Sequence, residues 1–492
     1  MDEHREHGGD VFAERRAKLA AWRAAGDVYP TQYQPRDEIG PLHDAYAGLE
    51  AGQDSGDVRR IAGRVMARRE HGKLTFVVLK DSSGELQLFA QLDALGAERY
   101  AAMEHIDLGD FAGAEGTVMR TRRGELSLRV ASWELLAKSL RPMPEKFHGL
   151  TDVETRYRRR YLDLMVNDAS REVFVKRARI VRAIRELLDR RGFIEVETPV
   201  LQPLYGGALA RPFITHHNEL ERDLYLRIAT ELYLKRCIIG GLDRVYEMGK
   251  DFRNEGVSFK HNPEFTMLET YEAYVDYNHV MTMVEEMVAE AAGAVGGLNV
   301  RFRDHEIDLT PPWPRLTMRK AIENETGIDI GETRDVPALH AAIKERGFDG
   351  VTLAPTWGLQ VDELFSEMVE PRLIQPVFIT EHPLETSPFA KKTPHDPRFV
   401  ERFEGFIAGM ELSNAFSELN DPEDQRERFV QQMQDLADGD ETAHRLDEDF
   451  LEAMEHGMPP TGGMGMGIDR IVMILTGAPS IRDVILFPAL RG

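Results

Sequence analysis

The stretch "DFRNEGVSFKHNPEFTMLETYEAY" (residues 251–274) is basic near its start and acidic and aromatic near its end. A strand's period of two places four side chains of its second half on one face: Phe265, Met267, Glu269 and Tyr271. The segment therefore predicts a strand, a basic loop and a second strand that offers one ligand both cations and a carboxylate. The alternative is an edge strand with Glu269 in solvent.

The first half of this stretch has the residues expected of a phosphate cradle. Arg253 and Glu255 are two residues apart at the end of the first strand, so their side chains share one face. Lys260 and His261 lie in the loop that follows. The planar fork of arginine matches phosphate oxygens, and lysine and histidine can add positive charge on the same side. Ordinary surface charge on a turn is the competing interpretation.

A second cluster, "RFEGFIAGMELSNAFSELND" (residues 402–421), repeats a glutamate every seven residues, at Glu404, Glu411 and Glu418. Carboxylates without cysteines or paired histidines suit a hard cation such as Mg²⁺. Strand parity, however, groups Asn414, Phe416 and Glu418 on one face and Glu411 on the other. A bulge, or a turn near Gly409, would be needed to bring Glu411 to the same ligand.

A third cluster, "MPPTGGMGMGIDRIVMILTG" (residues 458–477), joins closely spaced glycines to an apolar run. The glycines allow a ligand to approach the backbone, and the apolar run predicts a buried helix. Arg470 would lie at the start of that helix, where its charge opposes the helix dipole unless an anion or an aromatic base is bound. The lysine–hydroxyl ending of a P-loop is missing.

Composition places the chain among globular proteins of two or three domains, because it has 492 residues, 42% of them hydrophobic and 29% charged. No run approaches the length of a membrane span. The single cysteine, Cys237, excludes an internal disulfide and favours a reducing, cytoplasmic location. The net charge of −23 argues against indiscriminate nucleic-acid binding, although residues 58–161 carry more bases than acids.

Three regions are expected along the chain. Residues 1–57 form a helix over 10–25 and a connector over 31–57. Residues 58–147 contain short alternating runs separated by turns, which is typical of a small antiparallel barrel. Residues 148–492 mix helices and strands without a βαβ rhythm, which favours an α+β domain around an antiparallel sheet. There, "REVFVKRARIVRAIRELLDRRG" predicts a helix that stops at Gly192, and "FIEVETPVL" predicts a strand.

Together these segments resemble the class II aminoacyl-tRNA synthetases, and within them the lysyl-tRNA synthetases. Residues 176–200 are similar to motif 1, 245–274 to motif 2 and 462–477 to motif 3. The lysine-specific strings "RIATELYLKR", "LETYEAY", "SNAFSELNDP" and "PSIRDVILFP" are nearly complete. The resemblance runs from about residue 12 to the C-terminus. It implies an OB-fold barrel that reads the anticodon, followed by a catalytic domain built on an antiparallel sheet.

The resemblance also assigns roles. It implies catalytic roles for Arg253 and Arg470. ATP would be bound by Arg253, Glu255, His261, Asn262, Phe265, Glu404, Glu411 and Arg470. L-Lysine would be bound by Gly207, Glu231, Glu269, Tyr271, Asn414, Phe416, Glu418 and Gly463. Mg²⁺ would be held by carboxylates among Glu404, Glu411 and Glu418, with the choice between the last two open. Bases of the anticodon would meet Arg68, Phe76, Gln87 and Glu125.

The implied reaction joins lysine to ATP as lysyl-adenylate, releases pyrophosphate and passes the lysyl group to the 3′ end of tRNA(Lys). Motif 1 would build a homodimer, and no membrane partner is expected. Three alternatives compete: an aspartyl- or asparaginyl-type synthetase, an enzyme that attaches lysine to a protein, and a non-catalytic RNA-binding protein. Without the resemblance, Phe76 would be interpreted as a core aromatic residue.

Overall fold

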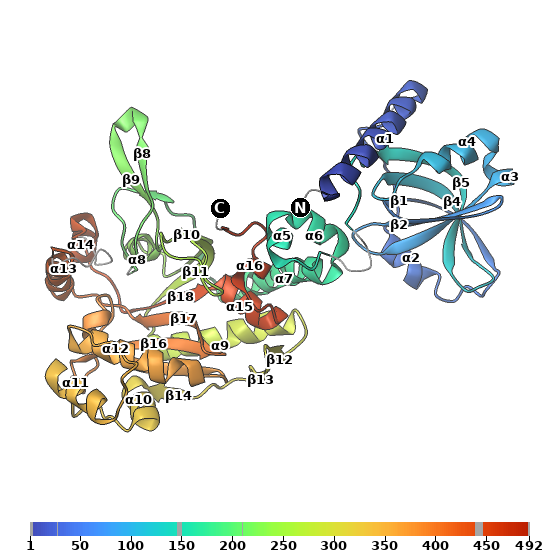
Figure 1. Ribbon diagram of the computed structural model, residues 1–492. Helices are drawn as coiled ribbons and strands as arrows, with labels where there is room; N and C mark the ends of the chain where they lie inside the picture. The colour runs from blue at the N-terminus through green and yellow to red at the C-terminus, as the bar shows by residue number, and fades with distance from the viewer. Residues whose placement is uncertain (1–2, 27, 145–149, 209, 438–445, 491–492) are drawn as a thin grey trace. The chain divides into compact units, whose positions relative to one another are not determined.

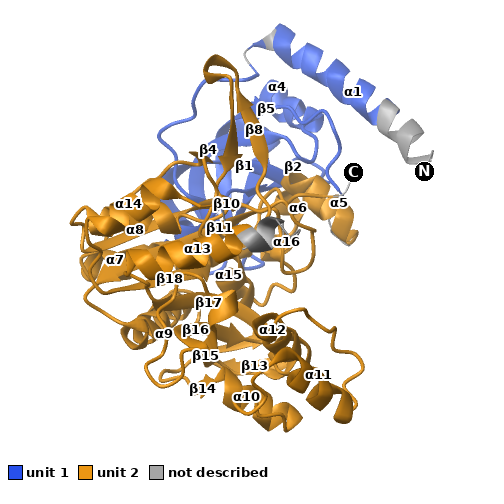
Figure 2. Ribbon diagram, turned by 90° about the vertical axis from the view of Figure 1, so that its left-hand side faces the viewer, with its two compact units in different colours: residues 1–150 blue, residues 151–492 orange. Residues whose placement is uncertain are grey.

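The computed structural model describes residues 3–26, 28–144, 150–208, 210–437 and 446–490 (Figure 1). The chain forms two compact units, residues 1–150 and 151–492 (Figure 2). The boundary expected at residues 147–148 lies outside the described residues. No helix among the described residues has both the length and the apolar content to cross a membrane.

The first unit contains a closed five-stranded barrel with the strand order β1-β2-β3-β5-β4. All its pairings are antiparallel except β3 with β5. Its elements are α1 (Glu3–Ala25), α2 (Ile39–Ala45), β1 (Asp54–His71), β2 (Leu74–Lys80), β3 (Glu85–Gln91), α3 (Leu92–Leu95), α4 (Ala97–Ala102), β4 (Phe111–Arg120) and β5 (Leu126–Ala137). This barrel confirms the predicted small β domain.

Alternation along the strands builds the barrel's core. Val77 and Leu79 of β2 and Leu86 and Leu88 of β3 are all buried, while the residues between them face outward. Residues 31–57, expected as a connector, contain α2 and the first residues of β1, and α2 packs against the barrel core. This helix was not predicted because it has only two turns and the segment is rich in Gly, Pro and Asp, which are typical of loops.

The second unit is built on an eight-stranded sheet with the order β14-β15-β16-β17-β18-β11-β10-β6. The central pairings are antiparallel, and only the two edge strands, β14 and β6, pair in parallel. The strands are β6 (Ile194–Glu195), β10 (Arg244–Phe252), β11 (Glu264–Ala273), β14 (Arg315–Thr317), β15 (Val377–Pro383), β16 (Phe399–Ile407), β17 (Met410–Ser417) and β18 (Thr461–Gly467). The α+β prediction is confirmed.

Helices cover one face of this sheet. The main core joins apolar residues of the sheet with α7 (Asp168–Arg190), α9 (Tyr277–Gly293) and α15 (Ile468–Thr476). Smaller elements surround them: α5 (Val153–Arg158), α6 (Arg160–Val166), β7 (Leu201–Gln202), β8 (Ile214–His217), β9 (Arg222–Leu226), α8 (Glu231–Ile239), β12 (Asn299–Phe302), β13 (His305–Asp308), α10 (Met318–Thr326), α11 (Val336–Glu345), α12 (Trp357–Met368), α13 (Pro422–Ala437), α14 (Glu448–Glu455) and α16 (Ile481–Val484). On the opposite face α8 packs against β10 and β11, and α10 and α12 pack against β15 and β16. The middle of that face is left for a cavity.

The strand predicted over "FIEVETPVL" is much shorter in the structure. Of this segment only β6 joins the large sheet, where it pairs with Val245 and Tyr246 of β10, and β7 joins a separate small sheet with β9. Pro199 lies between the two short strands and has no N–H to donate to a ladder, which explains why the strand does not continue. The preceding helix α7 ends at Arg190, and Gly192 follows in a left-handed conformation (φ 78°), as the sequence predicted.

Candidate functional site: a cavity with a cationic and an acidic end

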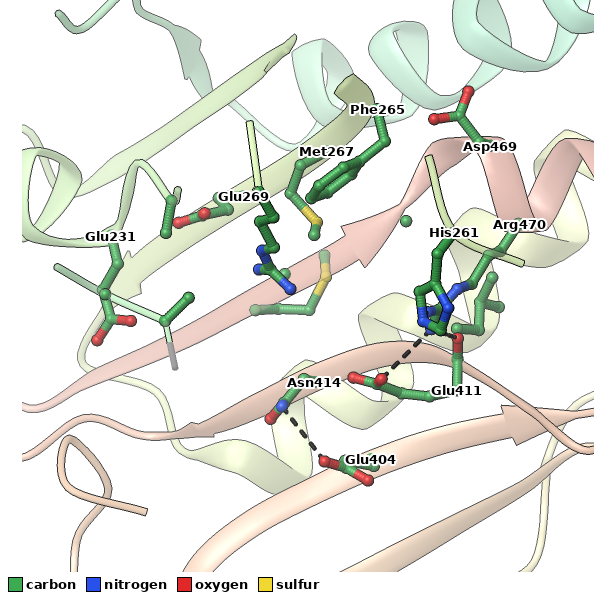
Figure 3. A pocket seen from close by; sticks show the side chains of 18 of the residues that line it. Glu231, His261, Phe265, Met267, Glu269, Glu404, Glu411, Asn414, Asp469 and Arg470 are labelled. Atoms are coloured by element: carbon green, nitrogen blue, oxygen red, sulfur yellow. Dashed lines mark hydrogen bonds and ion pairs between the residues drawn. The ribbon is translucent and has the colours of Figure 1, made fainter. Parts of the chain in front are cut away.

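A cavity of about 420 Å³ lies on the face of the large sheet away from α9. The four alternating residues of β11 all line it: Phe265, Met267, Glu269 and Tyr271. Backbone atoms of β18 form part of its floor, since its lining includes Gly463, Gly465 and Gly467. Figure 3 shows Glu231 and Glu269 toward one end, and His261 and Arg470 toward the other. The opening stretch of sequence thus supplies both chemical ends of one site.

Arg253 is available for an anionic ligand. It follows β10, where its N–H donates to the Pro263 carbonyl (2.9 Å) and holds the base of the loop closed. Its guanidinium carbon lies 5.1 Å from the ring centroid of Phe265, and its Nε donates to the carbonyl of Ile228 at 3.4 Å. Among the described residues no carboxylate forms an ion pair with Arg253. A cavity-lining arginine without an acidic partner is well suited to bind phosphate.

Arg470 lies near the start of α15, as predicted, and partners from β17 and the loop hold it there. It donates to the backbone carbonyl of Glu411 and pairs with the carboxylate of Glu411 at 3.3 Å, and its Nη2 lies 3.4 Å from Nε2 of His261. These contacts offset the unfavourable helix dipole. Its guanidinium and the ring of Phe265 both line the cavity, which provides two planar groups for an aromatic base.

His261 does not add positive charge at neutral pH, contrary to our expectation from the sequence. Partial burial of its ring and then the neighbouring guanidinium of Arg470 lower its pKa to about 4. Its Nδ1 lies 2.9 Å from the hydroxyl of Ser258. Lys260 is paired with Glu370 at 3.0 Å. The positive charge at this end therefore comes mainly from Arg253 and Arg470, while His261 contributes a neutral hydrogen-bonding ring.

A β-bulge brings Glu411 to the cavity. In the β16–β17 pairing Gly405 lies opposite Ser413, but Phe406 lies opposite Glu411, so Leu412 is an additional residue. Glu411 and Asn414 consequently both line the cavity, which settles the parity problem left open by the sequence. The displaced residue is Leu412, whereas Gly409 is in the hairpin turn with a left-handed backbone (φ 68°).

Glu404 of β16 is the second carboxylate at this position. Arg402 pairs with it at 2.7 Å, and the side-chain amide of Asn414 donates to it at 3.4 Å. Burial raises the pKa of Glu404 to about 8; Arg402 opposes this shift, and the charge of Glu411 adds to it. Each of these two carboxylates thus has an arginine partner, and the two still repel each other. Arg402 was not among the residues we expected, although it lies two residues before Glu404 and a strand would place both side chains on one face.

The acidic end is formed by Glu231 and Glu269. Glu231 is the first residue of α8, and Glu269 accepts hydrogen bonds from the Thr230 N–H (2.9 Å) and the Tyr271 hydroxyl (3.3 Å). Burial raises the pKa of Glu269 to about 8, and the charge of Asp251 adds to this shift. These buried carboxyl groups lack enough local cations, so the site can accept ammonium groups from a ligand.

Two glycines leave room at this end. Gly207 has a left-handed backbone (φ 88°), and a Cβ there would lie 2.9 Å from the Cβ of Glu231. A Cβ at Gly463 would collide with the carboxylate of Glu418 and the ring of Tyr271. Any larger residue at either position would displace an acidic side chain, which explains why glycine is required there.

Glu418 does not line the cavity. It lies behind Gly463 and Tyr271, is 1% exposed, and forms an ion pair with the buried Lys235. The expectation that it joins Glu404 and Glu411 around a metal is therefore unsupported by this arrangement, because its carboxylate is committed to another cation. Every other residue expected to bind ATP or lysine lines the cavity. Lys235 was missed because nothing in its local sequence distinguishes it from an ordinary helical lysine.

Of the residues expected at the anticodon, the first unit places two on one surface. Phe76 and Gln87 share the outward face of β2 and β3, where the ring of Phe76 lies edge-on to Phe89 with centroids 5.5 Å apart. Arg68 is on the other side of the strands, because it is in register with the buried Val77. Its guanidinium donates to the carbonyl of Glu104 at 3.0 Å. Glu125 is exposed immediately before β5.

Comparison with known proteins identifies the family to which the chain belongs. Residues 152–491 match the family of class II tRNA synthetases for D, K and N, and residues 60–136 match the OB-fold nucleic acid binding domain. The chain belongs to the class II tRNA synthetases. The two matches fall within the second and first compact units, respectively.

Several named members of this family are similar to the chain over nearly its whole length. The lysine–tRNA ligase of Moorella thermoacetica is 53% identical over 490 residues, which is 99% of each chain. That of Chloroflexus aurantiacus is 53% identical over 98% of each chain, and that of Syntrophomonas wolfei is 49% identical over 493 residues. The similarity covers both units and is not confined to the motifs.

Proposed function

We propose that this chain is a lysine–tRNA ligase. It activates L-lysine with ATP, forming lysyl-adenylate and pyrophosphate, and then transfers the lysyl group to the 3′ end of tRNA(Lys). The observation that carries the proposal is that one cavity has unpaired arginine charge at one end and undercompensated carboxylates at the other. The names of the full-length relatives support the same activity.

The acidic end favours lysine over the substrates of the nearest relatives. Lysine presents two ammonium groups, which Glu231 and Glu269 can accept as charged hydrogen-bond donors. Aspartate would place a third carboxylate beside them, and like-charge repulsion of this kind costs several kcal/mol. Asparagine has only its α-ammonium group and would leave one of the two charges uncompensated. The aspartyl and asparaginyl alternatives are therefore disfavoured by the chemistry of this end.

The other end is suited to ATP. Arg253 would hold the α-phosphate, and the faces of Phe265 and Arg470 would enclose the adenine. The lysine carboxylate can then attack the α-phosphorus in line; the bond from the α-phosphorus to the bridging oxygen breaks, and that oxygen leaves with pyrophosphate. No side-chain nucleophile takes part. Arg253 neutralises charge that develops on the phosphate, and the cavity holds the two reactants together.

Glu404 and Glu411 fit a divalent metal, which we assign as Mg²⁺. Burial and then repulsion from Glu411 raise the pKa of Glu404, and a bound cation would relieve that repulsion. Among the described residues no group of three or more carboxylate, histidine or cysteine side chains could hold a metal, which agrees with Mg²⁺ taking its remaining ligands from phosphates and water. When bound, Mg²⁺ supplies charge neutralisation to the phosphates.

The remaining partners belong to the same proposal. The outward face of β2 and β3 would stack an anticodon base of tRNA(Lys) on Phe76, with Gln87 as a polar contact on the same face and Arg68 and Glu125 as polar contacts from outside it. A second copy of the chain would cover the motif 1 region, where Ile194, 49% exposed, is an uncovered apolar side chain. The cytoplasmic location predicted from the single cysteine completes this proposal.

The decisive experiment is ATP–pyrophosphate exchange measured with each of the twenty amino acids. Exchange should depend on lysine and proceed without tRNA. A protein that exchanged only with aspartate or asparagine would belong to a different branch of the family. If ATP and lysine together produced no heat in calorimetry and no exchange, the non-catalytic RNA-binding alternative would replace this proposal.

A further inference from the structure

The buried stripe of α7 contains an arginine. Ile180 and Ile184 are 0% exposed and pack in the main core, and Arg177 lies three and seven residues before them, on the same side of the helix. An apolar residue is expected at such a position. Arg177 instead directs its guanidinium to the start of β11 and to the first turn of α15. Groups on these two elements must therefore satisfy its charge.

Three partners hold this guanidinium. Its Nη1 donates to the carboxylate of Asp469 at 2.6 Å and to the carbonyl of Val484 at 3.3 Å. Its Nη2 donates to the hydroxyl of Thr266 at 3.0 Å. Asp469 is 2% exposed, and its second oxygen accepts a hydrogen bond from the Thr266 N–H at 2.7 Å. Arg177 and Asp469 together thus bind both the side chain and the backbone of Thr266.

The sequence neighbours of these residues form the part of the cavity proposed to enclose the base. Phe265 precedes Thr266 on β11, and Arg470 follows Asp469 in α15. Both line the cavity, and Figure 3 shows Phe265, Asp469 and Arg470 on the same side of it. Because the Thr266 N–H is bonded to Asp469, the backbones that carry the two planar groups are fixed relative to each other.

We propose that the ion pair between Arg177 and Asp469 is a positioning device for the nucleotide base. The pair holds the ring of Phe265 and the guanidinium of Arg470 at the separation that accepts adenine. This inference rests on the proposed function. Arg177 is not among the described residues that line the cavity, so it acts through Asp469 and is a positioning residue.

The charge of Arg177 is needed as well as its hydrogen bonds. A buried carboxylate that loses its cation takes up a proton or turns toward another cation. Arg470 is adjacent to Asp469 in sequence, and its guanidinium already pairs with Glu411 at 3.3 Å. A second carboxylate drawn to Arg470 would move the guanidinium away from the base. Arg177 prevents this by keeping Asp469 directed toward α7.

The test measures nucleotide binding with and without the base. Calorimetry on the full chain with Mg²⁺ gives dissociation constants for ATP and for inorganic triphosphate, which has the phosphates but no adenine. Arg177→Met should weaken ATP binding about tenfold and triphosphate binding by less than about twofold, because only the base loses its contacts. The KM for lysine in pyrophosphate exchange should be unchanged.

Arg171→Met is the matched control. Arg171 pairs with Asp168 at 2.6 Å in the first turn of the same helix, where the carboxylate is exposed. Exposed pairs of this kind contribute little to stability. This variant therefore removes an arginine–aspartate pair from α7 without touching β11 or α15, and both dissociation constants should keep their wild-type values.

A double variant tests whether the carboxylate is the intermediary. Adding Asp469→Asn to Arg177→Met removes the unpaired charge, and the asparagine oxygen can still accept the hydrogen bond from the Thr266 N–H. ATP binding should return to within about threefold of the wild-type value. A double variant that bound ATP no better than Arg177→Met would overturn the inference, because Arg177 would then act without Asp469.

Results with Arg177→Met alone can also overturn it. Equal losses for ATP and triphosphate, or a KM for lysine that rises as much as that for ATP, would show that the whole cavity is disturbed. Unchanged ATP affinity would remove the pair from nucleotide binding. Should the wild-type protein bind no ATP and exchange no pyrophosphate with lysine, the proposed function would fail first. Lysine-dependent wild-type exchange combined with any of the other results would refute only the role of the pair.

Discussion

Replacing Glu269 with glutamine should weaken lysine binding selectively, because it removes one charge and leaves the side chain's shape. A carboxylate and an ammonium roughly 4 Å apart gain about 4 kcal/mol at an effective dielectric constant near 20. The carboxyl group has a pKa of about 8, so ionising it at pH 7 costs about 1 kcal/mol. The remaining 3 kcal/mol or so corresponds to a rise on the order of 10² in the dissociation constant.

Glutamine can keep the structural contact of Glu269, since its side-chain oxygen can still accept the hydrogen bond from the Thr230 N–H. The assay is ATP–pyrophosphate exchange, with KM determined separately for lysine and ATP. We expect a large increase for lysine and little change for ATP. Equal increases in both would show that the variant disturbs the whole cavity and would refute the placement of the ammonium beside Glu269.

The same reasoning predicts the pH dependence. Below pH 8 the ligand-free Glu269 carboxyl is mostly protonated, and an ammonium ligand binds its ionised form, so binding releases a proton. Lysine affinity should therefore increase as the pH rises from 6 to 8 and then level off. Calorimetry in buffers of different ionisation enthalpy measures the released proton, and Glu269→Gln should reduce that release. A wild-type affinity that fell over this range would contradict the assignment.

Four further changes test the other parts of the site. Arg253→Ala should lower the exchange rate by on the order of 10² or more, since one preorganised donor is typically worth about 3 kcal/mol; near-wild-type exchange would exclude its role at the phosphate. Glu404→Gln should raise the magnesium concentration needed for half-maximal exchange by about tenfold, and an unchanged requirement would remove it from the metal site. Phe76→Ala should weaken tRNA(Lys) binding by about 1–3 kcal/mol while exchange without tRNA keeps its rate; equal losses in both would point to misfolding. Ile194→Glu should convert a dimer to monomers in analytical ultracentrifugation, and an unaltered sedimentation coefficient would place the interface elsewhere.

The sequence by itself determined which side chains share a face wherever the backbone is regular. The period of two along β11 brought its four alternating residues to one cavity, because a strand offers no other choice once its register is uninterrupted. Arg470 at the start of an apolar helix was equally predictable, since the end of the glycine run locates the helix terminus. These are local properties of the chain, and they were enough to predict that the ligand has an anionic end and a cationic end.

Only the tertiary structure decided matters that depend on partners distant in the chain. The additional residue Leu412 turns Glu411 into the cavity, and such a bulge arises from the pairing of two strands. Glu418 is held behind the cavity wall because Lys235, far away in sequence, supplies its cation. His261 loses its charge to burial and to Arg470. Charge and burial are sums over all neighbours in space, which is the physical reason that residue spacing alone could not reveal them.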